Sequence, residues 1–312
     1  MKTPLVLVVA NNKGGVGKSL ITQLLATYLA YKKNLKILLL DYDPQGNASY
    51  RFLRDERIRD MSNYKPPLHP EYDPEEDDDW IGKSSALDMW TENPTVPYPT
   101  ELENLDILPS DADLIREIEN FEYIDSLEEI IQRPFDFFNM KEFKECDYDI
   151  VLIDTPPAKG PLTQAAIRAS THVLIPIELS NKSLQGLAGM VDLVNRQNVH
   201  RPLNKQSKIV GLLKNKVDYN KRTPQNRIVQ TIKDNPSLAS LLIEDVEIHD
   251  SPRAVDIDED QAPITAPYTE LKDSDRFAVE ALALGEYVYK SLGFKETKNE
   301  KETNNSDASA IA

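Results

Sequence analysis

The sequence has 312 residues, of which 40% are hydrophobic and 28% charged, so it predicts a globular protein with one large domain or two small ones. Its apolar runs are of strand length, well short of the roughly 20 residues of a membrane helix, and we find no signal peptide. The single cysteine, Cys146, excludes an intrachain disulfide and a metal site built on two cysteines. These features predict a cytoplasmic protein.

Residues 11–19 read Asn-Asn-Lys-Gly-Gly-Val-Gly-Lys-Ser and are the most informative stretch. They follow an apolar, β-branched run at 5–10 and precede a helical pattern at 20–30, which predicts a strand, a glycine-rich loop and a helix. Glycines in such a loop let backbone N–H groups close around a polyphosphate. In this arrangement Lys18 reaches the β- and γ-phosphates, and the Ser19 hydroxyl binds Mg²⁺.

The next buried strand is expected at 36–41, and it leads into Asp-x-Asp-Pro-Gln-Gly-Asn at 41–47. Residues 51–59 could extend a helix. Residues 51–100 otherwise have many prolines and a block of acidic residues, which predict a surface insertion with one short helix at 84–89.

A short strand is expected at 105–108, and Asp111 or Asp113 is predicted to cap a helical apolar stripe that runs from 114 to 131. Residues 150–154 form a second apolar run that ends in aspartate, followed by Thr-Pro-Pro. Because open α/β sheets bind ligands beyond the carboxyl ends of their strands, this aspartate, the one at 41 and the glycine loop converge on one site.

Strands are also expected at 173–177 and from 209, and helices up to about 196, at 224–234 and at 277–292. The net charge is −16, yet the segment from 196 to 233 carries ten Lys and Arg residues and one acidic residue, Asp218. This asymmetry predicts a basic face on an acidic body.

Taken together, these motifs resemble the ParA/MinD family of P-loop ATPases, and within it the ParA/Soj partition ATPases that have no N-terminal helix-turn-helix domain. As in the deviant Walker A loop of that family, the usual first glycine is replaced, here by Asn12, and a second lysine, Lys13, lies inside the loop. The resemblance implies an α/β fold, a mostly parallel, doubly wound P-loop NTPase sheet with helices on both faces. It implies a single domain over 1–294, with a variable insertion at about 51–100, and composition predicts a disordered tail at 295–312.

The resemblance also implies ATP and Mg²⁺ as ligands and assigns roles to single residues. Lys13 reaches across a nucleotide-sandwich dimer to the partner's phosphates. Asp43 orients the attacking water, and Asp41 helps to hold the magnesium shell. The loop at 247–253 closes over the base. The predicted metal-binding residues are Ser19, Asp41 and Asp154, and the predicted nucleotide-binding residues are Lys13, Gly14, Gly15, Val16, Gly17, Lys18, Ser19, Leu20, Asn215 and Pro252.

The implied activity is slow ATP hydrolysis, stimulated by a ParB-like or other cargo-linked protein. The ATP-bound homodimer is expected to bind DNA without sequence preference and to release it on hydrolysis, which would segregate or position a plasmid, chromosome or other cargo. The protein would then be cytoplasmic and nucleoid-associated, with no membrane partner. Cations that contact DNA phosphates are expected to make this binding sensitive to salt. The predicted DNA-binding residues are Arg201, Lys205, Lys208, Lys221, Arg222 and Arg227.

Four alternatives stay open. A dimerising adaptor ATPase that does not bind DNA would agree with the overall acidity. A MinD-like membrane switch would need a basic amphipathic C-terminal helix, whereas residues 299–312 are polar. The Asn-Lys-x-Asp sequence at 215–218 invites a GTPase interpretation. Metabolic P-loop enzymes such as dethiobiotin synthetase can share the paired lysines, but Asp-Pro-Gln-Gly-Asn at 43–47 disfavours them.

Overall fold

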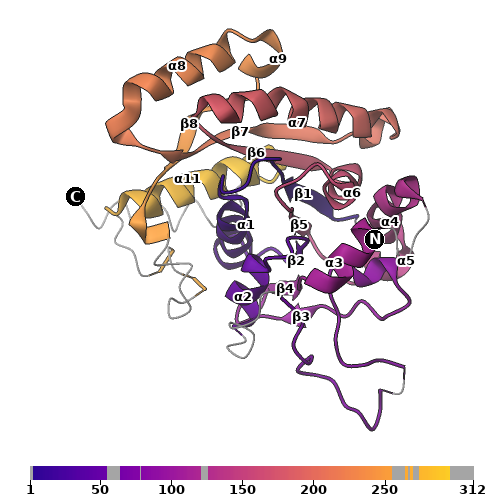
Figure 1. The fold of residues 1–312 in the computed structure, drawn as a ribbon. Coiled ribbons are helices and arrows are strands. Elements are labelled where there is room, and N and C mark those ends of the chain that lie inside the picture. Colours follow the sequence, from indigo (N-terminus) through magenta and orange to yellow (C-terminus); the bar gives the residue numbers. More distant parts are fainter. Residues whose placement is uncertain are drawn as a thin grey trace.

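A single sheet organises the chain. The structure is a computed structural model that describes residues 3–54, 64–77, 79–120, 126–254, 264–265, 268–269 and 274–295. Within these residues, eight strands form the order β3-β4-β2-β5-β1-β6-β7-β8, and helices cover both faces (Figure 1). All neighbouring strands are parallel except β3 and β4. The predicted mostly parallel, doubly wound α/β sheet is therefore confirmed.

The four central strands are β1 (Leu5–Val9), β2 (Ile37–Asp41), β5 (Ile150–Asp154) and β6 (His172–Glu178). They are almost entirely buried, as expected for parallel strands that are covered on both faces. The register pairs Asp41 with Asp154, and Asp154 with Val9. The two strand-ending aspartates and the start of the phosphate loop (residues 11–19) therefore meet at one edge of the sheet.

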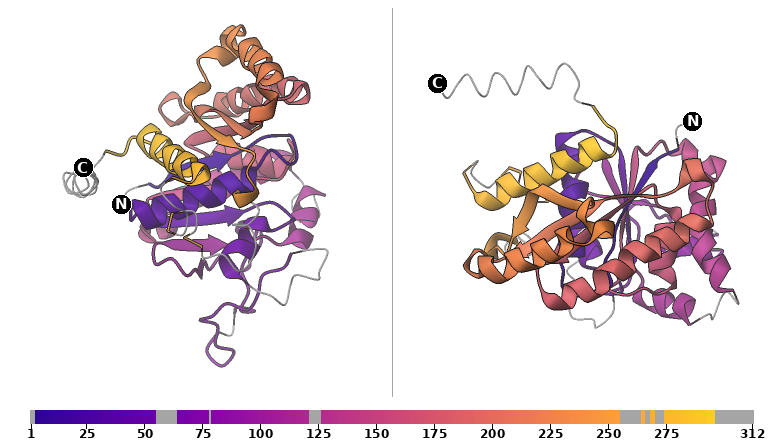
Figure 2. Two further views of the ribbon diagram at one scale, coloured as in Figure 1. Left: turned by 90° about the vertical axis from the view of Figure 1, so that its left-hand side faces the viewer. Right: turned by 90° about the horizontal axis from the view of Figure 1, so that it is seen from above.

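Side chains alternate between two hydrophobic cores, one on each face of the sheet. Leu7 and Val9 pack with α1 (Lys18–Thr27) and α11 (Arg276–Ser291), which cover one face. Val6 and Val8 belong to the core on the other face, which is covered by α4, α6 and α7 (Figure 2). These three helices are Leu127–Asn139, Pro161–Ala169 and Asn181–Val199.

The remaining elements complete the layers around the central strands. The other strands are β3 (Tyr98–Pro99), β4 (Leu105–Leu108), β7 (Lys208–Val217) and β8 (Leu242–His249). The other α-helices are α2 (Asn47–Leu53), α3 (Ala112–Glu119), α5 (Lys141–Glu145), α8 (Arg222–Lys233) and α9 (Pro236–Ala239). A π-helical turn η1 (Tyr28–Lys32) and the 3-10 turns η3 (Asp88–Trp90), η4 (Leu203–Lys205) and η5 (Tyr219–Lys221) connect them.

The predicted insertion is partly built into the domain. The short helix expected at 84–89 is the 3-10 turn η3, and Met89 and Trp90 belong to a hydrophobic core. The ring of Trp90 packs edge-on against Tyr42, with ring centroids 5.6 Å apart. Tyr64 lies so close to Gly46 that a Cβ there would be 2.5 Å from its ring. The insertion therefore packs against residues 41–49, hereafter the switch I segment, while its acidic loop projects away from the sheet (Figure 1).

Some boundaries differ from the predictions. The stripe predicted at 114–131 is divided between α3 and α4, and the Asp111 side chain caps α3 by accepting hydrogen bonds from the N–H groups of Asp113 and Leu114. β8 and α6 were not predicted. The possible helix extension at 55–59 and the tail from 296 lie outside the described residues. Within the described part of the chain, no helix is both long and apolar enough to cross a bilayer.

Candidate functional site

The phosphate loop has the conformation that its glycines allow. Gly15 and Gly17 have φ values of 73° and 84°, in the left-handed region that favours glycine. A Cβ on Gly17 would collide with the amide of Asn215. Because α1 begins at Lys18, the first N–H groups of this helix have no carbonyl partner within the helix and are available to an anion.

A cavity of about 420 Å³ opens over this helix N-terminus. The phosphate loop, the switch I segment, Pro157 after β5, the end of β7 and the loop after β8 all contribute to its walls. The predicted residues Gly15, Gly17, Lys18, Ser19, Leu20 and Asp43 line it, as do Asp250 and Ser251 of the loop predicted to close over the base. Gln23 and Lys216, which the sequence did not single out, line it too. The segments that were predicted to converge therefore do share one cavity.

Lys18 lines the cavity, and the fully buried Asp154 interacts with it electrostatically. Both are buried, and burial lowers the pKa of Lys18 while Asp154 and Asp43 raise it. Burial, followed by the neighbouring Asp41, raises the pKa of Asp154 well above its ordinary value, and a hydrogen bond from the Ser19 side chain opposes this shift. Thr22 Oγ1 donates to Asp154 Oδ1 at 3.5 Å, but Oδ2 has no hydrogen-bond donor among the described residues. A buried carboxylate oxygen without a donor, next to Ser19, fits a magnesium–triphosphate ligand.

Asp41 has a different environment although it is equally buried. Its Oδ1 accepts a hydrogen bond from the Asp43 N–H at 3.1 Å, and its Oδ2 accepts from Ser49 N–H and Ser49 Oγ at 2.9 and 2.7 Å. Burial raises the pKa of Asp41 to about 6, against the opposing effect of the hydrogen bonds from Ser49. Both oxygens of Asp41 thus hold the switch I segment in place.

Asp43 faces the cavity from the same segment. Its Oδ1 accepts from the Gln45 N–H at 2.9 Å, and Ser110 Oγ donates to its backbone carbonyl at 2.7 Å. Burial raises the pKa of the Asp43 carboxyl, and Lys18 opposes this shift. A fixed carboxylate with a raised pKa, beside a phosphate loop, is suited to accept a hydrogen bond from water.

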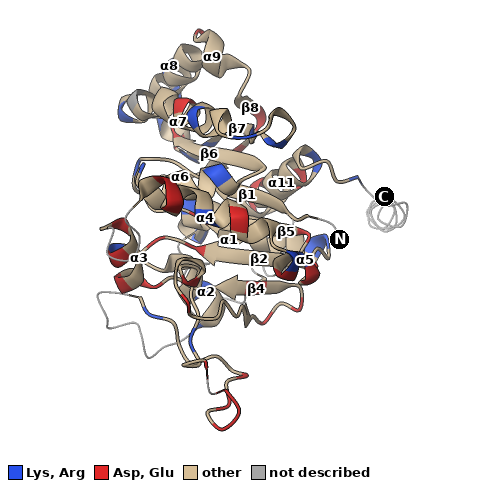
Figure 3. Ribbon diagram, turned by 90° about the vertical axis from the view of Figure 1, so that its right-hand side faces the viewer, with Lys and Arg blue, Asp and Glu red and all other residues tan. Residues whose placement is uncertain are grey.

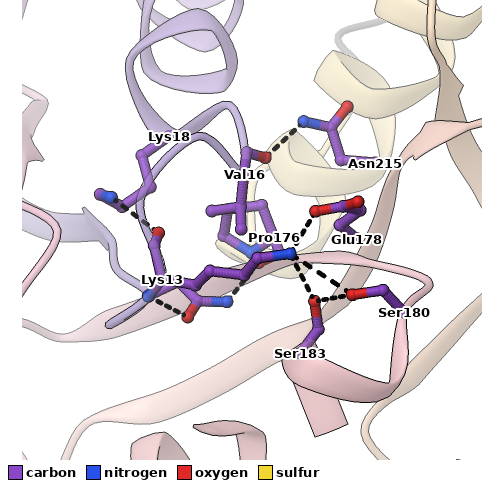
Figure 4. Close-up of polar contacts among 9 residues, drawn as sticks. Lys13, Val16, Lys18, Pro176, Glu178, Ser180, Ser183 and Asn215 are labelled. Atoms are coloured by element: carbon purple, nitrogen blue, oxygen red, sulfur yellow. Dashed lines mark hydrogen bonds and ion pairs between the residues drawn. The ribbon is translucent and has the colours of Figure 1, made fainter.

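Lys13 does not line its own cavity. Its Nζ forms an ion pair with Glu178 and donates to Ser180 Oγ and Ser183 Oγ at 3.3 and 3.2 Å (Figure 4). Asn11 ties the start of the loop to β6, since its Nδ2 donates to the Pro176 carbonyl at 2.7 Å. The two lysines of the loop therefore have separate environments, one inside the cavity and one at the end of β6.

The predicted base contacts differ in their placement. Asn215 is buried, its Nδ2 donates to the Val16 carbonyl at 2.7 Å, and its Oδ1 has no donor among the described residues. Pro252 is exposed, and its neighbour Ser251 lines the cavity instead. Asp218, the last residue of Asn-Lys-x-Asp, accepts from the Asn220 N–H at 2.9 Å and pairs with Lys221, so it caps η5.

One of the six predicted DNA-binding cations is not exposed. The prediction that Arg201 contacts DNA is wrong, because its side chain is buried. It lies over the Phe135 ring and donates to the Ser170 carbonyl and Ser207 Oγ. Burial lowers its pKa to about 10, and its bonds connect the segment after α7 to the end of α6 and to the residue before β7. Arg201 is therefore a structural residue.

The other five cations are exposed and fall into two groups along the chain. The blue segments of Figure 3, which mark all Lys and Arg residues, are spread over several elements. Lys205 and Lys208 lie at the start of β7, whereas Lys221 and Arg222 follow its end, about 30 Å away at strand rise. Arg227 lies within α8, near the second group. The Arg222 guanidinium lies over the Tyr219 ring, 4.8 Å from its centroid.

Comparisons with known proteins agree with these features. Residues 5–209 match the AAA_31 family, described as an AAA domain. The sporulation initiation inhibitor protein Soj of Bacillus subtilis is 29% identical over 214 residues, 68% of this chain and 73% of Soj. The chromosome partitioning protein ParA of Caulobacter vibrioides is 31% identical over 211 residues, 67% of this chain and 68% of ParA. An ATP complex of McdA from Cyanothece has the same fold, with a TM-score of 0.70 at 20% identity over 95% of this chain and 99% of that one. The chain belongs to the ParA/Soj family of P-loop ATPases.

Proposed function

We propose that the chain is a partition ATPase that hydrolyses ATP to ADP and phosphate and whose ATP-bound homodimer holds DNA. The observation that carries this proposal is the separation of the two loop lysines. Lys18 lines the nucleotide cavity with Asp43, and Lys13 lies outside it. A lysine that does not serve its own phosphates is free to serve those of a second subunit.

Hydrolysis would use the residues in and beside the cavity. The N–H groups at the start of α1 and the Lys18 ammonium bind and orient the triphosphate. Ser19 and Asp154 would hold Mg²⁺, which neutralises charge on the phosphate oxygens when it is bound. Asp43 accepts a hydrogen bond from the attacking water and orients it, while Asp41 keeps the switch I segment in position.

Dimerisation would follow from electrostatics. Two triphosphates that face each other across an interface of low dielectric constant repel strongly. Lys13 from each subunit would offset this repulsion by exchanging Glu178 for the partner's phosphates. The bound nucleotide therefore controls dimerisation. A ParB-like or other cargo-linked protein that stimulates hydrolysis would cause the dimer to dissociate.

DNA binding would use the cations around α8. Lys221, Arg222 and Arg227 are exposed within a short stretch of chain, and contacts to DNA phosphates need positive charge rather than a particular base. Such a surface would localise the dimer to the nucleoid in the cytoplasm. Because the net charge is −16, the rest of the protein would have little affinity for nucleic acid.

The test is DNA retention with ATP, with ADP and without nucleotide, across a salt series. We expect retention with ATP alone, and a salt slope that falls by about 2 in the double variant Arg222→Glu/Arg227→Glu because two phosphate contacts are lost. The matched control is Lys205→Glu/Lys208→Glu, which changes the same charge at the other end of β7. Equal retention in all nucleotide states, or equal behaviour of the two double variants, would contradict the proposed surface.

A second candidate is a dimerising adaptor ATPase that does not bind DNA. The net charge of −16 favours it. It predicts ATP-dependent dimers in light scattering, with no DNA retention at any salt concentration. The same salt series therefore decides between the two functions.

A further inference from the structure

Gln23 is a buried amide in the wall of the nucleotide cavity. It lies in α1 four residues after Ser19, so the two side chains share one face of the helix. Its side chain is only 5% exposed, and it lines the cavity with Ser19 and Asn47. Polar groups at such positions are costly unless they are hydrogen-bonded.

One end of the Gln23 amide is engaged, and the other is not. Its Nε2 donates to the Asn47 carbonyl at 3.3 Å, and Asn47 is the first residue of α2 in the switch I segment. This bond fixes the amide, so that Oε1 is the end that remains. Oε1 is buried and has no donor among the residues that the structure describes.

The chemistry of an amide oxygen limits what can satisfy it. Phosphate oxygens are acceptors and cannot bond to Oε1, and the side-chain cations of Lys18 and Lys13 have other contacts. Asn215, at the end of β7, has the matching orphaned acceptor for an amino group of the base. What Gln23 lacks is therefore an O–H donor that enters with the nucleotide.

We propose that Gln23 Oε1 accepts a hydrogen bond from such an O–H group, either a Mg²⁺-bound water or a ribose hydroxyl, while Nε2 continues to hold Asn47. This inference rests on the proposed nucleotide binding. Gln23 is then a positioning residue, since one rigid amide connects the occupied site to the segment that carries Asp43. Nucleotide binding and the position of the switch I segment, which carries Asp43, are then linked through the Gln23 side chain.

The test compares the full chain with Gln23→Met, which keeps the length of the side chain and removes both hydrogen bonds. Affinity is measured by calorimetry for ATP, 2′-deoxy-ATP and 3′-deoxy-ATP, each with Mg²⁺ and with EDTA. We expect Gln23→Met to bind Mg–ATP about 2- to 13-fold more weakly, the size of one neutral hydrogen bond. The melting temperature of the ligand-free variant should change little, because the loss of the hydrogen bond to Asn47 opposes the gain from removing a buried orphaned acceptor.

The pattern across ligands identifies the donor. If a ribose hydroxyl is the source, the wild type discriminates against one deoxynucleotide and Gln23→Met does not. If a Mg²⁺-bound water is the source, the variant loses part of the Mg²⁺ dependence and treats the three nucleotides as the wild type does. A loss that is equal under all conditions, or no loss, would overturn the inference while leaving nucleotide binding intact. Failure of the wild type to bind ATP would instead refute the proposed function.

Discussion

Asp41 and Asp154 are two buried aspartates that differ in how their carboxylate oxygens are hydrogen-bonded. Each ends a buried parallel strand, the two are partners in the sheet register, and burial raises the pKa of both. Yet Asp41 accepts three hydrogen bonds from the switch I segment, whereas Asp154 keeps one oxygen without a donor among the described residues.

The difference shows that burial and charge alone do not identify a ligand-binding group. A carboxylate whose oxygens are occupied by the protein organises the backbone around it, and a carboxylate with an orphaned oxygen is completed by something that binds. We therefore propose that Asp154 with Ser19 serves the magnesium shell and that Asp41 serves it only indirectly, by holding Asp43.

The comparison depends on the cavity being the nucleotide site, and Lys18→Ala tests this with the largest expected effect. Loss of a buried, charge-assisted contact to the phosphates should weaken ATP binding on the order of 100-fold in calorimetry. Lys13→Ala is the control, because Lys13 does not line the cavity and should leave monomer affinity nearly unchanged while abolishing the ATP-dependent dimer. Retained tight binding by Lys18→Ala would refute the assignment.

The two aspartates should then separate in their magnesium dependence. Asp154→Ala should bind ATP equally well with Mg²⁺ and with EDTA, a loss of about tenfold or more in the presence of Mg²⁺. Asp41→Ala should keep the Mg²⁺ dependence but lose turnover, since Asp43 is no longer held. If both variants lose the Mg²⁺ dependence equally, the distinction drawn from their hydrogen bonds is wrong.

Acid should reveal the same site with a moderate effect. The pKa of Asp41 is raised from 3.8 to about 6, so its stabilising contribution to the ligand-free chain is complete below about 3.8 and is lost as the pH rises through about 6. Protonation of Asp154, whose pKa is also raised, competes with Mg²⁺. The rise in melting temperature caused by Mg–ATP should therefore shrink as the pH is lowered. A rise that does not depend on pH would argue that neither carboxyl senses the ligand.

The smallest effect is expected at the resting position of Lys13. Its ion pair with Glu178 is about a third exposed, so it contributes only about 0–1 kcal/mol. Glu178→Gln should release Lys13 and lower the ATP concentration that half-saturates the dimer by at most about fivefold. Light scattering at fixed protein concentration measures this, and a higher ATP requirement would mean that Glu178 itself supports the dimer.

The local motifs of this chain could be predicted from the sequence because their physics is local. The continuous apolar runs of β1, β2 and β5 indicate strands that are buried on both faces, and the glycines with positive φ lie in the predicted loop. β8 was missed because its buried and exposed residues do not alternate regularly. α6 was missed because polar residues, including the buried Arg168, interrupt the apolar pattern expected of a helix.

The predictions that failed or were never made depend on distant contacts. Arg201 has the charge expected of a DNA contact, and only the position of Phe135 and Ser170 shows that it is buried. The metal role of Asp41 stays a prediction, and the sequence could not show that Ser49 donates two hydrogen bonds to one of its oxygens. The spacing of Gln23 from Ser19 can be read from the sequence. That Gln23 Oε1 has no donor among the described residues can be seen only once Nε2 is bonded to Asn47 in the switch I segment.

The packing of Tyr64 on Gly46, and of Trp90 on Tyr42, has a practical consequence for protein engineering. A segment that has the composition of a surface insertion packs against the turn that carries Asp43. Trimming it to obtain a smaller enzyme would expose that turn to solvent. Grafting it onto a relative would also transfer its contacts with the switch I segment.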